Sequence, residues 1–277
     1  MKKRIWFITG ISSGLGRALI RAVVQSGDFA IGTLRQQDQV DAFNISHKEK
    51  AMALKVDITR PEEINQAAKF IESEFNRLDV LVNNAGFGFA GAIEETSISE
   101  AKEIFEANFF GALRVTQSLL PLFRKQQSGH IIQISSHGGI KAFPGFGIYN
   151  ASKFALEGFS EALAAEVSPH GIKVTLVEPG PFRTNFAGSS FREPANILEA
   201  YAGTAGTFRE RMKQVNGKQE GDPVKAAQAI INITNSENPP LRLPLGKVAL
   251  ATIASKLESV QRDLEATRDM AENVVFA

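Results

Sequence analysis

The stretch Thr9-Gly10-Ile11-Ser12-Ser13-Gly14-Leu15-Gly16 decides the fold. It follows the short apolar run Ile5 to Ile8, which is typical of a buried strand, and it precedes a helical pattern over 17–26. Its three glycines allow a tight turn and a close approach of a ligand to the backbone. The helix that follows presents free N–H groups and the positive end of its dipole, which favour an anion such as a pyrophosphate. Because similar turns also join strands to helices where no ligand binds, the loop alone leaves both interpretations open.

Downstream of this loop, short apolar runs alternate with helical patterns as far as residue 180. Runs that are apolar on both faces and separated by helices are typical of parallel strands covered on both sides. The pattern predicts an α/β protein with a doubly wound parallel sheet of the Rossmann type, in one domain over 1–277. We expect strands over 5–9, 29–34, 51–56, 79–83, 129–135 and 172–178, and helices over 17–26, 62–75, 99–120 and 151–167.

The composition excludes several classes of protein. Lys and Arg number 31 against 30 Asp and Glu, a net charge of +1, so we expect no nucleic-acid partner. There is no cysteine, and no pair among the four histidines has the spacing of metal ligands, so we expect no metal. No apolar run approaches the roughly 18–20 residues of a membrane span, and the first one is too short for a secretory signal. We therefore expect a cytoplasmic protein.

The end of the second predicted strand bears on the choice of cofactor. In dinucleotide-binding folds an acidic residue about 20 residues after the glycine loop binds the ribose diol of NAD. This chain has Gly32-Thr33-Leu34-Arg35 there, without an acid. The guanidinium of Arg35 is available to a 2′-phosphate, although a solvated surface arginine is the alternative. The stretch favours NADP(H), with NAD as the other candidate.

Tyr149 and Lys153 are four residues apart, so at helical spacing the phenol and the ammonium are neighbours. A nearby cation stabilises the phenolate and lowers the pKa of tyrosine from about 10, which would suit a general acid–base. By itself a Tyr–Lys pair at this spacing is a weak signal, and a purely structural pair is the alternative. Ser136 follows the strand over 129–135, at the strand end where open α/β sheets bind ligands. It is therefore expected to donate a hydrogen bond to a substrate oxygen, with a serine that simply ends the strand as the alternative.

Five motifs occur together in this order: Thr9-Gly10-x-x-x-Gly14-x-Gly16, Asn83-Asn84-Ala85-Gly86, Ser136 thirteen residues before Tyr149, Tyr149-x-x-x-Lys153, and Pro179-Gly180. In them the chain resembles the NADP(H)-preferring branch of the single-domain short-chain dehydrogenase/reductase family, over residues 5–184. The resemblance implies an oxidoreductase that transfers a hydride between NADP(H) and a carbonyl or secondary alcohol.

The resemblance also implies a role for each matching residue. Tyr149 would exchange a proton with the reacting oxygen, Ser136 would orient that oxygen, and Lys153 would bind the nicotinamide ribose and lower the tyrosine pKa. Asn108 would support a proton-relay water. Many NADP-preferring relatives carry a basic residue inside the glycine loop, which this chain lacks, so Arg35 would hold the 2′-phosphate mostly alone. The residues implied to bind the cofactor are Gly10, Ser12, Ser13, Gly14, Leu15, Gly16, Arg35, Asp57, Asn83, Ala85, Gly86, Tyr149, Lys153, Pro179, Gly180 and Thr184.

The domain is expected to have three parts. Residues 1–184 would form the cofactor-binding and catalytic core, and the irregular segment 185–222 a substrate loop or lid. Residues 223–277 would add helices over 224–234 and 247–272. An apolar stripe on the last helix would pack on its own domain or, alternatively, on a partner helix in an oligomer. The stripe consists of Leu250, Ile253, Leu257, Val260 and Leu264.

Phenylalanines on loops beyond the strand ends favour a small, mainly apolar substrate. They are Phe87, Phe89, Phe143, Phe146, Phe182 and Phe186. The resemblance further implies a homodimer or homotetramer through the helices over 99–120 and 151–167. The alternative function is a catalytically silent, dinucleotide-sensing regulatory protein. Such proteins usually lack the tyrosine or lysine that this chain retains.

Overall fold

The first strand, β1 (Ile5–Ile8), lies inside a seven-stranded sheet of order β3-β2-β1-β4-β6-β7-β9. Every neighbouring pair in this sheet is parallel, which confirms the predicted doubly wound α/β fold. The other strands of the sheet are β2 (Phe29–Leu34), β3 (Ala51–Lys55), β4 (Val80–Asn83), β6 (Gly129–Ile134), β7 (Ile172–Pro179) and β9 (Arg242–Leu245). The computed structural model describes residues 3–188 and 190–276, and positions 1, 2, 189 and 277 of the predicted domain lie outside the described residues.

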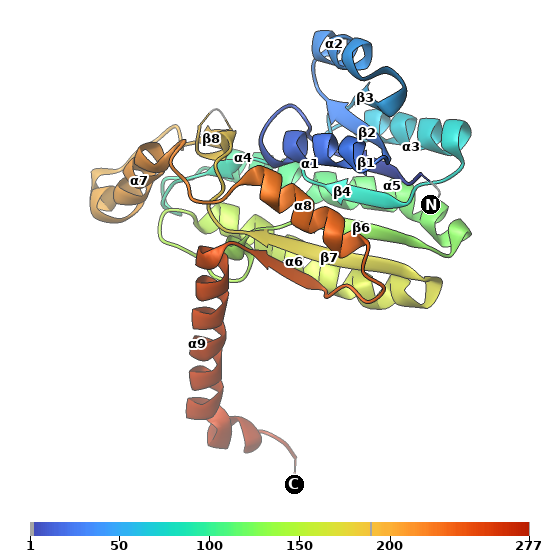
Figure 1. The fold of residues 1–277 in the computed structure, drawn as a ribbon. Helices are drawn as coiled ribbons and strands as arrows, with labels where there is room; N and C mark the ends of the chain where they lie inside the picture. Colours follow the sequence, from blue (N-terminus) through green and yellow to red (C-terminus); the bar gives the residue numbers. More distant parts are fainter. Residues whose placement is uncertain (1–2, 189, 277) are drawn as a thin grey trace.

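Helices cover both faces of the sheet (Figure 1). Trp6 and Ile8 of β1 point to one face, where α1 and α8 pack, and Phe7 points to the other, against α3, α5 and α6. Each fully buried side chain of this size stabilises the fold by about 1.5–3 kcal/mol. The helices are α1 (Gly14–Gln25), α2 (Gln37–His47), α3 (Pro61–Phe75), α4 (Ile98–Phe105), α5 (Gly111–Gln126), α6 (Gly147–Val167), α7 (Thr207–Val215), α8 (Pro223–Thr234) and α9 (Lys247–Glu272).

Several helix boundaries follow from their end residues. Pro61 occupies the first turn of α3, where its missing N–H is not needed, and Asn76 ends this helix in the left-handed conformation. Ser97 and Glu100 form a capping box at the start of α4. The Asp222 side chain accepts a hydrogen bond from the Val224 N–H at the start of α8.

The structure differs from the predicted elements at α2, within the helix over 99–120, and at β9. α2 was not predicted because Val40 is its only buried residue, so the apolar period is too weak to detect. The predicted helix over 99–120 is divided by a π-helical turn, Glu106–Phe110. β9 was not predicted either, because Pro244 interrupts its apolar run. This strand lies at the edge of the sheet, the position in a sheet where proline is tolerated.

The segment 185–222 is more ordered than the expected irregular loop. It contains β8 (Phe191–Arg192), which pairs in parallel with β5 (Gly88–Phe89), and the helix α7. Arg209 of α7 forms a buried ion pair with Glu95, at 2.6 Å between Nη1 and Oε2. These contacts fasten the segment to the loops beyond β4.

The last helix, α9, leaves the body of the molecule and points away from it (Figure 1). Of the five residues in the predicted apolar stripe, only Ile253 is half-buried. Leu250, Leu257, Val260 and Leu264 are 58%, 63%, 39% and 58% exposed. The prediction that this stripe packs on its own domain is therefore wrong, because the helix leaves the body within about its first two turns.

Candidate active site

A cleft of about 1010 Å³ lies at the carboxyl ends of the sheet strands. Its floor is the glycine loop after β1, and its walls come from the segments that follow β2, β3, β4, β6 and β7. This is where open α/β sheets bind ligands, because neighbouring loops diverge there. Of the residues implied to bind the cofactor, all except Asn83 line this cleft.

The glycine loop is shaped so that side chains would block it. Gly10 and Gly14 have φ of +72° and +55°, the left-handed region that favours glycine. A Cβ atom on Gly16 would lie 2.3 Å from the Gly10 carbonyl oxygen, so only glycine fits this close approach. The α1 N-terminus has neither a side-chain cap nor an acid in its first turn. The loop therefore fits the pyrophosphate of a dinucleotide.

The end of β2 is joined directly to this loop. The Thr33 hydroxyl accepts a hydrogen bond from the Gly10 N–H at 2.9 Å, and the Thr33 carbonyl accepts one from Ile11 at 3.1 Å. Arg35 is exposed and lines the cleft beside this junction. Asp57 also lines the cleft, and its carboxylate accepts hydrogen bonds from the N–H and hydroxyl of Thr59. Arg35 and Asp57 could thus meet the adenosine half of the cofactor.

Ser136, Tyr149 and Lys153 lie together in the same cleft and are each buried. The Tyr149 ring stacks on Phe146 with centroids 4.1 Å apart, so its orientation is fixed. The Lys153 Nζ lies 6.0 Å from the centroid of that ring and donates a hydrogen bond to the Ile134 carbonyl at 2.9 Å. A proton donor and an ammonium therefore face the same space as the glycine loop.

The charge states differ from the sequence prediction. Burial raises the pKa of Tyr149 well above its ordinary value, and the Ser136 hydroxyl offsets this only in part. Burial lowers the pKa of Lys153 to about 8, and the carboxylate of Glu157 acts against that decrease. The pKa of Tyr149 is thus raised and not lowered as the sequence predicted, because desolvation outweighs the hydrogen bond with Ser136.

Two of the implied asparagines lie behind the cleft. The Asn83 side chain points away from it and donates to the Thr116 hydroxyl at 2.9 Å, whereas the neighbouring Asn84 lines the cleft. Asn108 is buried on the π-helical turn, where its amide holds both the N–H and the carbonyl of Phe87 at 3.0 Å. Asn108 thus fixes the loop that carries Gly86.

Aromatic side chains form the opposite wall of the cleft. Phe143, Phe146, Phe182 and Phe186 line it as expected from the sequence, together with Phe87, whereas Phe89 is buried elsewhere. Sequence reasoning missed the contribution of α7, because that segment lacked a clear helical period. The residues of this helix that line the cleft are Phe208, Arg211, Met212 and Val215.

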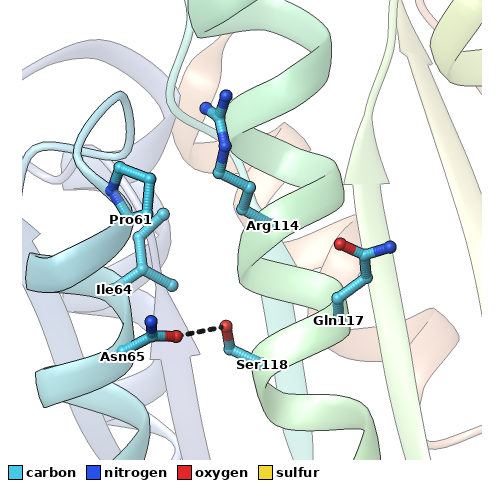
Figure 2. A pocket seen from close by; sticks show the side chains of 6 residues that line it. All are labelled: Pro61, Ile64, Asn65, Arg114, Gln117 and Ser118. Atoms are coloured by element: carbon cyan, nitrogen blue, oxygen red, sulfur yellow. Dashed lines mark hydrogen bonds between the residues drawn. The ribbon is translucent and has the colours of Figure 1, made fainter.

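A smaller hollow of about 250 Å³ lies between α3 and α5 (Figure 2). The Ser118 hydroxyl donates to the Asn65 amide oxygen across it, at 3.2 Å. It contains none of the predicted site residues. The hollow is lined by Pro61, Ile64, Asn65, Arg114, Gln117 and Ser118.

Among residues 3–188 and 190–276, no three histidine, aspartate or glutamate side chains are grouped so that they could hold a metal ion. Over the same described part of the chain, no helix combines the length and the apolar character that crossing a bilayer requires.

The parallel sheet and its cleft are those of a Rossmann-type oxidoreductase. The family model for short chain dehydrogenases matches residues 4–195. The chain therefore belongs to the short-chain dehydrogenase family.

Similar proteins include a 3-ketodihydrosphingosine reductase of Bacteroides thetaiotaomicron, 38% identical over 92% of each chain. A solved short-chain dehydrogenase of Streptomyces avermitilis is 41% identical, with a TM-score of 0.92 over 99% of this chain and 100% of that one. The structure of ElxO with NADP bound is 25% identical, with a TM-score of 0.74 over 91% of this chain and 100% of that one.

Proposed function

We propose that this protein transfers a hydride between NADP(H) and an apolar ketone or secondary alcohol, with Tyr149 as the general acid–base. The observation that carries the proposal is the shared cleft, which brings Ser136, Tyr149 and Lys153 together with the glycine loop. When bound, the nicotinamide supplies or accepts the hydride, and the protein supplies placement and proton transfer. Cytoplasmic location stays a prediction from the sequence.

The roles of the three residues follow from their surroundings. Because burial keeps the Tyr149 phenol protonated at neutral pH, the phenol is ready to donate a proton to a carbonyl oxygen. Ser136 lines the same cleft as Tyr149 and would orient that oxygen through its hydroxyl. Lys153 would hold the nicotinamide ribose, and Asn108 would keep the adjoining loop in place.

The aromatic wall supports an apolar substrate. Phe146 and Phe186 both contact the Tyr149 ring, so the part of a substrate next to the reacting oxygen would meet aromatic carbon. Similarity to a 3-ketodihydrosphingosine reductase supports a ketone carried on a long apolar chain. The segment 185–222 would act as the substrate loop, since α7 forms part of this wall.

A direct assay tests the proposal. Loss of NADPH absorbance is followed with a series of ketones of increasing chain length, and NADPH formation with the matching secondary alcohols. We expect turnover that improves with chain length. Absence of turnover with every member, despite tight NADPH binding, would favour the silent regulatory protein instead.

Replacing Arg35 with aspartate is expected to shift the cofactor preference. A charged hydrogen bond to the 2′-phosphate contributes about 1.5–3 kcal/mol, so the ratio of kcat/KM for NADPH over NADH should fall by about 10- to 100-fold. Arg21→Asp is the matched control, because Arg21 is an exposed residue of α1 that does not line the cleft. An unchanged ratio in Arg35→Asp would contradict the assignment of Arg35.

We also propose a homodimer or homotetramer formed through the helices over 99–120 and 151–167. Phe110 and Phe154 lie on these segments and are 41% and 42% exposed, which supports burial against another subunit. Light scattering should give a multiple of the 30.1 kDa chain mass for the wild type, and a smaller assembly for Phe110→Glu. A wild-type mass of one chain would disprove this interface. Leu257→Glu tests the exposed stripe of α9 in the same way.

A further inference from the structure

A group of charged side chains lies behind the proposed catalytic lysine, where α6, β7 and β9 meet. Glu157 follows Lys153 by one helical turn on α6 and is 5% exposed. Glu178 of β7 is completely buried. Arg242 of β9 is the cation that reaches both glutamates. Buried carboxylates without full compensation are costly, so such a group calls for an explanation.

The guanidinium of Arg242 contacts three carboxylates. The Arg242 Nε lies 3.4 Å from Glu157 Oε2 and 3.5 Å from Glu178 Oε1, and Nη2 donates to Glu161 Oε2 at 2.6 Å. No well-formed hydrogen bond from a described residue reaches the carboxylate oxygens of Glu157 and Glu178. Burial therefore raises the pKa of Glu157, and burial together with the charge of Glu157 raises that of Glu178 to about 7. The negative charge of Glu157 thus disfavours a second negative charge on Glu178, and both carboxylates lie within reach of the same guanidinium.

The charge of Lys153 depends on the charge of Glu157. The lysine is buried, and the Ile134 carbonyl is its hydrogen-bond acceptor at 2.9 Å. Within the described part of the chain, Glu157 is the acid whose charge raises the lysine pKa against the effect of burial. An ammonium with a pKa of about 8 would become largely neutral at physiological pH if this charge were lost.

We propose that Glu157 is a positioning residue for Lys153: its carboxylate keeps the lysine charged, and Arg242 favours the ionised form of that carboxylate. Through Arg242 and Glu157, the edge strand β9 thereby influences the charge of Lys153, which lines the cleft. This proposal rests on the proposed function only for the consequence in turnover. The effect on the charge of Lys153 stands without it.

Other titratable groups also lie near Lys153 and Glu157. Glu161, on the same helix, contacts Arg242 but its side chain is 61% exposed, so water screens its charge. From the 3-10 turn His137–Gly139, Gly139 faces Glu157, whereas the His137 ring lies 5.2 Å from that of Phe143. Tyr149, on the lysine's other side, stays neutral because burial raises its pKa. Glu157 and Glu161 thus form a matched pair that differs in burial.

The experiment measures the titration of Lys153 itself. Selective ¹³C and ¹⁵N labelling of lysine gives side-chain NMR resonances, and the Lys153 signal is assigned by its absence in Lys153→Arg. In Glu157→Gln we expect the midpoint to fall by about one pH unit, because the opposing charge is lost. The ratio of neutral to charged lysine at a given pH then rises about tenfold. Glu161→Gln, the control, should leave the midpoint unchanged. Glu157→Asp should keep the midpoint close to that of the wild type, because a carboxylate remains.

Turnover provides the second measurement. In Glu157→Gln the alkaline limb of the pH profile of kcat/KM should move to lower pH by the same amount as the lysine midpoint. An unchanged Lys153 midpoint in Glu157→Gln would overturn the proposal. A lowered midpoint with an unchanged pH profile would support the charge relation and contradict the catalytic role of Lys153.

A second variant tests the proposal if Glu157→Gln fails to fold. Glu178→Gln removes the competitor for Arg242 and leaves the carboxylate next to Lys153 in place. We expect the lysine midpoint at or above that of the wild type, because the carboxylate of Glu157 and its contact with Arg242 remain. A lowered midpoint in Glu178→Gln would contradict the proposed order of influence.

Discussion

Replacing Tyr149 with phenylalanine is expected to lower kcat by about 10²- to 10⁴-fold with the best ketone substrate. The change removes the phenolic proton donor and nothing else. The ring keeps its stacking on Phe146 at 4.1 Å and its edge contact with Phe186 at 5.6 Å, so the fold of the cleft should be maintained. Steady-state kinetics with NADPH measure the effect, and NADPH binding should be unchanged by fluorescence titration.

The chain supplies its own control for this variant. Tyr201 is the other tyrosine, and its hydroxyl donates to Glu94 outside the cleft. Tyr201→Phe should leave kcat within about twofold of the wild type, as expected for a surface position. A kcat for Tyr149→Phe within tenfold of the wild type would remove Tyr149 from the role of general acid–base.

Replacing Arg209 with methionine is expected to lower the free energy of unfolding by about 3–5 kcal/mol. Glu95 is fully buried in its side chain, and its carboxylate binds Arg209 and the N–H groups of Ala92 and Leu198. Burial alone would raise the pKa of Glu95, but these hydrogen bonds outweigh it and hold the pKa below the ordinary value. Without Arg209 an unmatched carboxylate would remain inside the protein.

Urea unfolding measures this loss, and hydrogen exchange would locate it in α7 and the segment beside it. Lys213→Met is the control, because Lys213 makes exposed ion pairs on the same helix and should cost less than about 1 kcal/mol. Adding Glu95→Gln to Arg209→Met should restore part of the stability, since a neutral amide is less costly to leave unmatched. Equal stabilities of Arg209→Met and Lys213→Met would disprove the buried-pair argument.

The pH dependence gives an independent check on this pair. Because the pKa of Glu95 is lower in the folded than in the unfolded protein, the pair stabilises the fold above the unfolded value. That contribution is lost as the pH falls through the folded pKa. The difference between the wild type and Arg209→Met should therefore decrease in acid.

The sheet was predictable because its signals are local. β1, β2, β4, β6 and β7 each coincide with a predicted strand to within one residue at either end. A buried parallel strand is apolar on both faces, so its neighbours in sequence already reveal it. α2 and β9 lack such a signal: α2 buries little, and β9 depends on its pairing with β7.

The candidate site likewise has features that the sequence predicted and features that only the tertiary structure showed. The sequence by itself determined the fold and family, and the presence of Gly10, Ser136, Tyr149 and Lys153, because spacing along strands and helices is a local property. Only the tertiary structure decided that Asn83 points away, that α7 completes the wall, and that Glu157 and Glu178 lie within reach of Arg242. These features depend on contacts between distant segments and on desolvation, and desolvation exists only once the chain has packed.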